Sequence, residues 1–207
     1  EINRDLAYET AQKAKSEGVS QIIFMSSMSV YGIDTGIITK DTETCPKSHY
    51  GKSKLQAERQ ISQLAEKTFS VTILRPPMIY GKGCNGNYAK LAKLAKKIPV
   101  FPEIKNQRSM LYIDNLSEFI RNLIDTRQDG LFLPQNEEYV CTSELVKEIA
   151  GLYGRKMKVV EIFNPLIIIL HDRVKILNKI FGSLVYFQDA SVCHTIGFKE
   201  SVRLSEQ

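Results

Sequence analysis

The sequence predicts an α/β fold in which helices connect the strands of a parallel sheet. Short runs rich in β-branched and aromatic residues alternate with longer stretches whose apolar side chains recur at helical spacing. Turn-forming residues separate the two kinds of run, and strands linked by helices in this way favour βαβ units. With 207 residues and 43% apolar side chains, the chain is long enough for one sizeable domain, or for a domain with a small lobe.

The N-terminal part of the chain shows the clearest alternation. Its first helix is expected to end at Gly18, a residue typical of helix C-termini. A strand then leads into a serine cluster, and a polar loop separates that cluster from the next helix. The following strand runs into Arg75-Pro76-Pro77, where regular structure must break. The expected elements are a helix over 3–17, a strand over 21–25, a loop over 34–46, a helix over 50–67 and a strand over 69–74.

The remaining elements are shorter. Pro99 ends a helix, and Asp114 or Asn115 is expected to cap the N-terminus of another. Apolar residues from 166 to 181 form one stripe of an amphipathic helix. We expect this stripe to pack against the protein, with docking on a partner or a membrane surface as the alternative. The other expected elements are a helix over 88–97, a strand over 110–113, a helix over 116–125, a strand over 130–133 and a helix over 142–150.

Composition argues against several classes of protein. The formal net charge is +5 and the lysines are scattered, so nucleic-acid binding is not expected. The four cysteines lack Cys-x-x-Cys spacing, which predicts free thiols in a reducing cytoplasm and no metal site. The N-terminus is polar, and the longest apolar run, 165–170, is too short to span a bilayer. Membrane contact is expected to be peripheral at most.

The strongest functional signal is a tyrosine, a lysine and a serine in two short segments. Tyr50 and Lys54 are four residues apart, so they share one face of the helix expected there. A cation held beside a tyrosine favours the phenolate form. Ser27 follows the strand over 21–25, and catalytic groups of open α/β sheets collect at the carboxyl ends of strands. These side chains predict a proton-transfer site for the hydroxyl of a sugar or an alcohol.

Four segments in a fixed order make this signal specific. They are FMSSMSVYG at 24–32, YGKSKLQAE at 50–58, LRPPMIYG at 74–81 and RSMLYIDNL at 108–116. In these segments the sequence resembles the extended short-chain dehydrogenases/reductases, specifically the NAD-dependent nucleotide-sugar epimerase/dehydratase family with its UDP-glucose 4-epimerase-like members. The resemblance covers residues 3–120.

The resemblance implies a role for each matching residue. Tyr50 would be the general base, Lys54 would hold the nicotinamide ribose, and Ser27 would hydrogen-bond the reacting oxygen. Arg108 falls where the family places an arginine on the nucleotide diphosphate, a role that suits its planar fork of donors. The implied catalytic residues are Ser27, Tyr50 and Lys54, the cofactor contacts are Ser26, Tyr50, Lys54, Pro76, Pro77 and Met78, and the substrate contacts are Asn87, Tyr88 and Arg108.

The resemblance also implies the domain organisation. The chain would be the C-terminal part of a doubly wound parallel-sheet (Rossmann-like) domain with a small substrate-binding lobe. Residues 1–80 would form the C-terminal half of the NAD-binding domain and 81–207 the lobe, with 109–125 returning to the NAD-binding domain. The family's phosphate loop belongs to its first βα units, which are not found upstream of Glu1. We therefore expect an N-terminally truncated chain that is inactive alone, from an enzyme that uses NAD, with NADP as the alternative.

A second glycine-rich motif has a different interpretation. The segment GKGCNG at 81–86 matches G-x-G-x-x-G, which in a first βα unit would bind a dinucleotide. Here six residues, Pro76 and Pro77 among them, separate the strand over 69–74 from Gly81, so the tight turn that such a site needs is missing. We interpret the segment as a mobile loop over the substrate side.

The residues after Ser27 narrow the expected reaction. In the resembling 4,6-dehydratases, Asp-Glu follows the catalytic hydroxyl residue, whereas Met28 and Ser29 stand here. The resemblance therefore implies 4-epimerisation of a UDP-hexose through a transient keto sugar. The alternatives are an NAD(P)-dependent nucleotide-keto-sugar reductase or dehydratase, and a non-catalytic dinucleotide-sensing protein of the same fold. The enzyme is expected to be cytoplasmic, to form a homodimer and to serve polysaccharide biosynthesis.

Overall fold

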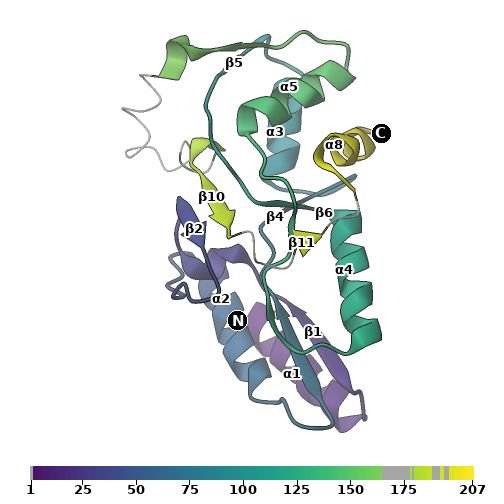
Figure 1. Ribbon diagram of the computed structural model, residues 1–207. Helices are drawn as coiled ribbons and strands as arrows, with labels where there is room; N and C mark the ends of the chain where they lie inside the picture. The colour runs from purple at the N-terminus through teal and green to yellow at the C-terminus, as the bar shows by residue number, and fades with distance from the viewer. Residues whose placement is uncertain (1, 165–177, 179, 188–191, 194–195) are drawn as a thin grey trace.

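The computed structural model describes residues 2–164, 178, 180–187, 192–193 and 196–207. Figure 1 shows an N-terminal sheet with its helices at one end of the molecule and a helical lobe at the other. Most of the 166–181 stripe lies outside the described residues. No helix in the described part of the chain has both the length and the apolar character needed to cross a bilayer.

A parallel sheet forms the centre of the N-terminal end. Its three strands lie in the order β1 (Gln21–Met25), β3 (Ser70–Leu74) and β7 (Gly130–Phe132). Both strand pairs are parallel, with Gln21 opposite Ser70 in the first. The predicted α/β class with parallel strands is therefore confirmed.

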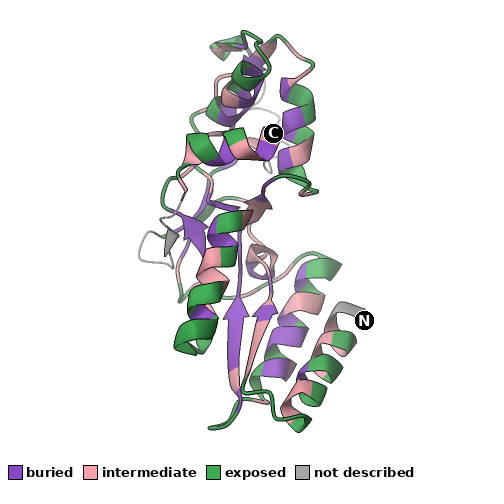
Figure 2. Cartoon of the chain, turned by 90° about the vertical axis from the view of Figure 1, so that its right-hand side faces the viewer, coloured by how far each residue is buried: buried purple, intermediate pink, exposed green. Residues whose placement is uncertain are grey.

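Helices cover both faces of this sheet (Figure 1). On one face α1 (Ile2–Ser16) and α2 (His49–Ser62) pack against Phe24, and on the other α4 (Ile113–Thr126) packs against Met25. Successive residues of a strand point to opposite faces, so a buried strand is apolar on both. Figure 2 shows that the outer faces of these helices are exposed, whereas β3 is mostly buried and β1 is half-buried.

The lobe at the other end is mainly helical. Its helices α3 (Asn87–Ala95), α5 (Thr142–Leu152) and α8 (Phe198–Glu206) surround the aromatic end of a parallel pair of strands, β4 (Met78–Tyr80) and β6 (Met110–Tyr112). The largest apolar cluster lies between these helices. Tyr80 at the end of β4 is fully buried in this cluster and stacks on Tyr88 of α3. The lobe also contains β5 (Val100–Pro102), β9 (Lys158–Val160) and the 3-10 helix η2 (Glu161–Phe163).

Two short parallel strand pairs join the C-terminal residues to earlier parts of the chain. β2 (Gly36–Ile38) pairs with β10 (Leu184–Tyr186), and β8 (Gln135–Asn136) pairs with β11 (Val192–Cys193). Between β1 and β2 the chain forms a short 3-10 helix, η1 (Met28–Tyr31). The C-terminal residues thereby become part of the wall around the end of the sheet.

Several of these elements were missing from the sequence-based prediction. The loop expected over 34–46 contains β2, and the segment after the two prolines forms β4. Both strands have three residues and depend on partners distant in sequence, so local periodicity does not reveal them. The prediction also lacked η1, β5, β8, β9, η2, β10, β11 and α8.

The predicted C-terminal end of helix α2 was wrong. α2 ends at Ser62, short of the expected residue 67. Glu66 and Phe69 form an antiparallel bridge with hydrogen bonds in both directions, which turns the chain into β3. The main-chain groups of this turn therefore pair with each other rather than with the last turn of a longer helix.

The predicted cap of α4 was also wrong. The helix begins at Ile113, so Asp114 and Asn115 both lie within its first turn and neither caps it. The buried Asn115 side chain instead donates from Nδ2 to Asn136 Oδ1 (3.0 Å) and to the carbonyl of Ile196 (2.9 Å). The Asn115 amide, which the sequence suggested as a helix cap, therefore forms tertiary hydrogen bonds instead.

One strand of the three-stranded sheet, β7, lies outside the segment 109–125 that was predicted to return to the N-terminal domain. It follows that segment in the chain and lies beside β3. The three-stranded sheet therefore draws on residues up to Phe132. The division into residues 1–80 and 81–207 remains a prediction.

A buried ion pair fixes the end of β3 to α2. The Arg75 guanidinium donates from Nη2 to Glu58 Oε2 (2.6 Å), from Nε to Glu58 Oε1 (3.0 Å) and from Nη1 to the Tyr31 hydroxyl (3.0 Å). The Tyr186 hydroxyl donates to the Arg75 carbonyl (2.6 Å). Burial alone would lower the Arg75 pKa, but the bonds and charge of Glu58 outweigh it and raise the pKa above its ordinary value. The pair joins α2, β3, η1 and β10.

Replacing Glu58 with glutamine should lower the free energy of unfolding by about 3–5 kcal/mol, because it leaves the Arg75 guanidinium buried without a counter-charge. Urea denaturation measures the change. Glu118→Gln, which removes the partner of Arg121 in a surface pair on α4, is the control and should cost at most about 1 kcal/mol. Equal losses in the two variants would contradict the assignment of a structural role to the buried pair.

Candidate active site

The hydroxyl of Ser27 lies where β1 ends. Ser26 N–H donates to the Leu74 carbonyl (2.7 Å), and Met28 N–H donates to the Pro76 carbonyl (2.9 Å). These bonds hold the segment against the end of β3. Ser27 itself is extended and caps η1, and its Oγ accepts a hydrogen bond from Ser29 N–H (3.2 Å). No described residue accepts a hydrogen bond from the Ser27 hydroxyl, so its proton can be donated to a ligand in front of the strand end.

Tyr50 lies in the first turn of α2. Ser48 caps this helix, since its Oγ accepts from Gly51 N–H (3.0 Å), and 49% of the Tyr50 surface is exposed. Gly51 faces the Ser29 carbonyl so closely that a Cβ there would lie 2.6 Å from the oxygen. A glycine at this position lets the start of α2 approach η1, which brings the phenol and the serine hydroxyl to the same cavity.

Lys54 connects Tyr50 with the end of β1. Its Nζ donates to the Met25 carbonyl (2.9 Å) and lies 5.8 Å from the centre of the Tyr50 ring. It also lies 4.9 Å from the centre of the Phe24 ring. Burial lowers the pKa of Lys54, and the charge of Glu58 partly opposes this. The spacing expected from the sequence does place the ammonium beside the tyrosine.

One cavity brings most of the predicted residues together. Its volume is about 920 Å³, and it opens at the carboxyl end of the sheet between η1, the start of α2 and the 81–86 loop. Eight of the ten predicted site residues line it: Ser26, Ser27, Tyr50, Pro76, Pro77, Met78, Asn87 and Arg108. Residues separated by more than fifty positions in the sequence therefore line the same cavity, as the residues of a single active site must.

Two predicted residues do not line this cavity. Lys54 lies behind Tyr50, in contact with its ring as described above. Tyr88 is 3% exposed and stacks on Tyr80, with ring centres 5.1 Å apart. Burial, together with the charge of Glu206, raises the Tyr88 pKa above its ordinary value. The Tyr88 side chain thus belongs to the core of the lobe, while its neighbour Asn87 faces the cavity.

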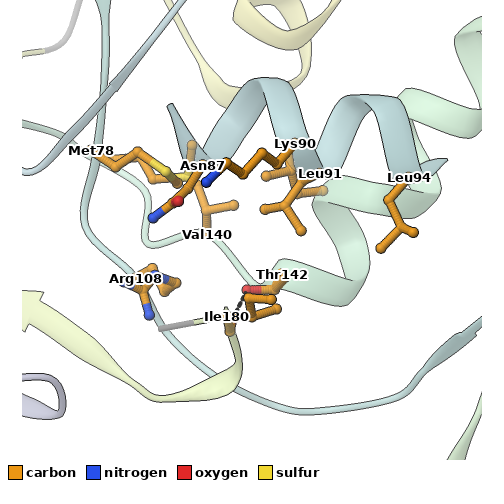
Figure 3. A pocket seen from close by; sticks show the side chains of 11 residues that line it. Met78, Asn87, Lys90, Leu91, Leu94, Arg108, Val140, Thr142 and Ile180 are labelled. Atoms are coloured by element: carbon orange, nitrogen blue, oxygen red, sulfur yellow. Dashed lines mark hydrogen bonds between the residues drawn. The ribbon is translucent and has the colours of Figure 1, made fainter. Parts of the chain in front are cut away.

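A second, more apolar pocket adjoins the first. Its volume is about 470 Å³, and Met78, Asn87 and Arg108 line both spaces. Figure 3 shows these three residues at one end of the pocket and Leu94 at the other. The remaining lining residues are Lys90, Leu91, Met110, Val140, Thr142, Leu145 and Ile180. A ligand gripped at the shared end could therefore extend into an apolar space under α3.

The sequence reasoning missed Lys90 and Asp34, which line the second pocket and the first cavity respectively. Lys90 follows Asn87 by three residues, so helical spacing on α3 could have placed both on one face. Asp34 follows the 24–32 motif, but nothing local indicates that the chain turns it toward Arg108. Burial lowers the pKa of Arg108, and the negative charge of Asp34 partly opposes this shift.

The 81–86 loop borders the first cavity through Asn85 and Gly86. Gly86 precedes α3 and offers no side-chain cap, so the first N–H groups of the helix lack a side-chain acceptor from that residue. Helix N-termini attract anions, and this one begins at Asn87, where the two cavities meet. Residues 81–86 form a loop in the structure, and the interpretation of this segment as a mobile loop over the substrate side stays a prediction.

Comparisons with known proteins agree with this geometry. The profile of the NAD dependent epimerase/dehydratase family matches residues 1–164. The chain belongs to this family. The family expected from the four sequence motifs and the expected α/β fold with a parallel sheet are both confirmed.

Relatives of this epimerase/dehydratase chain include two curated 4-epimerases. It is 33% identical to a UDP-glucose 4-epimerase of Vibrio cholerae over 159 residues, which are 72% of this chain and 48% of the relative. It is 28% identical to the N-acetyl-alpha-D-glucosaminyl-diphospho-ditrans,octacis-undecaprenol 4-epimerase of Escherichia coli O157:H7 over 212 residues, 93% of this chain and 64% of the relative. The chain thus spans about half to two thirds of the length of these relatives.

The fold matches solved structures more completely. The crystal structure of a UDP-glucuronic acid 4-epimerase from Bacillus cereus in complex with NAD has a TM-score of 0.74 with this chain. The alignment covers 99% of this chain and 66% of that one at 17% identity, so it shows the shared fold.

The cavity suits part of a dinucleotide, the cofactor that the family description names. Ser26 is 4% exposed and lines the cavity, and its Oγ has no hydrogen-bond partner among the described residues. A buried hydroxyl without a partner is costly, so a polar ligand group is expected there. Pro76 and Pro77 add an apolar edge beside it. No group of three or more metal-ligating side chains occurs in the described part of the chain.

Replacing Lys54 with methionine should alter the pH dependence of stability. Because burial lowers the Lys54 pKa, the unfolded chain binds this proton more readily than the folded one. The free energy of unfolding should therefore rise with pH between the lowered pKa and the ordinary value of 10.5, and Lys54→Met should lose this rise.

Urea denaturation over a series of alkaline pH values measures this effect. Lys52→Met changes an exposed lysine on the same helix and should keep the rise. If both variants keep it, Lys54 is not the group whose titration is coupled to folding.

Proposed function

We propose that this chain belongs to an NAD-dependent epimerase of a nucleotide sugar, which interconverts a UDP-hexose and its C4 epimer through a transient keto sugar. The observation that carries the proposal is the meeting of Ser27 and Tyr50 in one cavity, with the Lys54 ammonium behind the Tyr50 ring. This set can remove a proton from a carbinol and return it without an added acid.

Each of the three residues has a distinct task in the proposed reaction. Tyr50 takes the proton of the C4 hydroxyl and later returns it, and the Ser27 hydroxyl donates to the same oxygen. Lys54 holds its positive charge beside the phenol, which favours the phenolate. Bound NAD supplies the acceptor, and then the donor, of the hydride at C4. The close contact of α2 with η1 at Gly51 holds Tyr50 and Ser27 in fixed relative positions during both half-reactions.

The proposed cofactor contacts lie at the sheet end of the cavity. Ser26 offers its unpaired hydroxyl, and Pro76, Pro77 and Met78 form the wall that a nicotinamide ring would face. Tyr50 and Lys54 complete this set. Residues 1–80 are proposed to form the cofactor side of the enzyme and 81–207 the substrate lobe.

The proposed diphosphate site lies where the two cavities meet. Arg108 and Asn87 line both spaces, the N-terminus of α3 adds N–H groups, and Lys90 adds a second cation. Arginine forks and helix N-termini are the groups that bind phosphates in proteins. Tyr88, buried beside Asn87, is proposed to serve this site by fixing α3 through its stack on Tyr80.

Epimerisation is favoured over the alternatives by the residues after Ser27. Met28 and Ser29 both line the cavity, yet neither carries the carboxylate that elimination of water from the sugar requires. The two relatives from Vibrio cholerae and Escherichia coli described above are named as 4-epimerases, and both names contain a diphosphate-linked sugar. A non-catalytic dinucleotide sensor would not need the Tyr50–Lys54 pair, and a reductase would consume its cofactor at each turnover.

Tyr50→Phe in the full-length protein that contains this chain should reduce interconversion of UDP-glucose and UDP-galactose, or of their N-acetylated counterparts, by about 10²–10⁴-fold, because general-base catalysis is lost. Chromatography of the nucleotide sugars measures this rate. Tyr153→Phe, at an exposed tyrosine at the end of α5, is the control and should retain it.

Two outcomes would overturn this proposal. The first is unchanged turnover in Tyr50→Phe. The second is stoichiometric consumption of NADPH or NADH by the parent enzyme with a single sugar product, because an epimerase regenerates its cofactor in each cycle.

A further inference from the structure

The main chain of Arg108 is held between two other segments. Its N–H donates to the Val140 carbonyl (3.0 Å), and Val140 N–H donates to the Arg108 carbonyl (2.9 Å). On the other side, Leu184 N–H donates to the Gln107 carbonyl (2.9 Å) and Ser109 N–H donates to the Leu184 carbonyl (3.1 Å). These bonds fix the backbone, but several rotatable bonds still separate it from the guanidinium.

One main-chain oxygen fixes the guanidinium itself. Nη1 of Arg108 donates to the Gly182 carbonyl at 2.8 Å. No carboxylate in the described part of the chain forms an ion pair with Arg108, and Asp34 acts on it only through longer-range charge. The remaining donors of the fork are therefore available to a ligand in the two cavities that Arg108 lines. The direction of the fork depends on where the Gly182 carbonyl lies.

Gly182 lies in a space that has no room for a side chain. A Cβ there would lie 2.5 Å from the Asn178 carbonyl oxygen and 2.7 Å from Cγ2 of Thr35. The first contact is with main chain that also accepts from Gly182 N–H (2.8 Å), so it cannot move without breaking that bond. Its backbone is not left-handed, so crowding is the obstacle to a larger residue. The glycine allows the chain before β10 to pack between Thr35 and Arg108.

We propose that Gly182 is a positioning residue, whose carbonyl aims the Arg108 guanidinium at the diphosphate of the substrate. This role rests on the proposed function, in which Arg108 holds that diphosphate. A methyl group at position 182 shifts the carbonyl away from its present place, and the fork of Arg108 then has no fixed direction. The substrate binds more weakly, while the proton-transfer residues at the other end of the cavity keep their geometry.

A double-mutant cycle in the full-length protein tests this role, with uridine diphosphate as the probe and calorimetry as the measurement. Gly182→Ala should weaken binding about tenfold, the effect of one hydrogen bond to a charged group. Arg108→Ala should weaken it at least as much, and adding Gly182→Ala to Arg108→Ala should cause no further loss. Gly151→Ala in α5, where a Cβ meets nothing within 4 Å, is the matched control and should bind as the parent does.

A second variant separates positioning from general damage to the fold. Thr35→Ser removes the methyl group nearest the new Cβ, so Gly182→Ala combined with Thr35→Ser should recover part of the lost affinity. KM for the nucleotide sugar should rise in Gly182→Ala with little change in kcat.

The outcomes distinguish the two proposals. An equal fold-loss from Gly182→Ala in both Arg108 backgrounds, or no loss at all, overturns the positioning role while the diphosphate role of Arg108 stands. Unchanged affinity in Arg108→Ala, or no binding by the parent, removes the diphosphate role and the positioning role with it.

Discussion

The buried pair of Arg75 and Glu58 is the constraint on which the rest of the site depends. It fixes the carboxyl end of β3 to the helix that carries Tyr50 and Lys54, and Tyr31 extends the same network to η1. Two charges taken out of water are tolerated only when their hydrogen bonds are satisfied, so these elements cannot shift independently. Ser27 and Tyr50 thereby meet in one cavity although they belong to different elements.

Much of the sheet and of the proton-transfer site could be predicted from the sequence. The strands β1 and β3 are short runs rich in β-branched and other apolar residues, with helices on both of their faces, and such runs are visible without tertiary information. Tyr50 and Lys54 belong to one helix, so their spacing alone places them together. Ser27 directly follows a predicted strand, and the carboxyl ends of strands are where catalytic side chains of open α/β sheets collect.

The rest depends on contacts between distant segments, which no local pattern encodes. β2 and β10 form only because they pair with each other, and each is too short to show the alternating hydrophobic pattern of a strand in the sequence. Asn115 was expected to cap α4 but pairs with Asn136 and Ile196, because a buried amide needs several partners at once. Tyr88 and Asn87 are neighbours in sequence, yet helical geometry sends one into the core and the other to the cavity.

The β2–β10 pair has a consequence for the order in which the protein can assemble. The hydroxyl of Tyr186 bonds the Arg75 carbonyl across 111 positions of the chain, and Leu184 pairs with Gly36. Contacts of such long sequence separation form late, since the loop-closure entropy must be met before they contribute. On the ribosome, the sheet and α2 can fold as soon as they emerge. The wall that carries Arg108 is completed only after β10 has been synthesised, which is later than the synthesis of β1, α2 and β3.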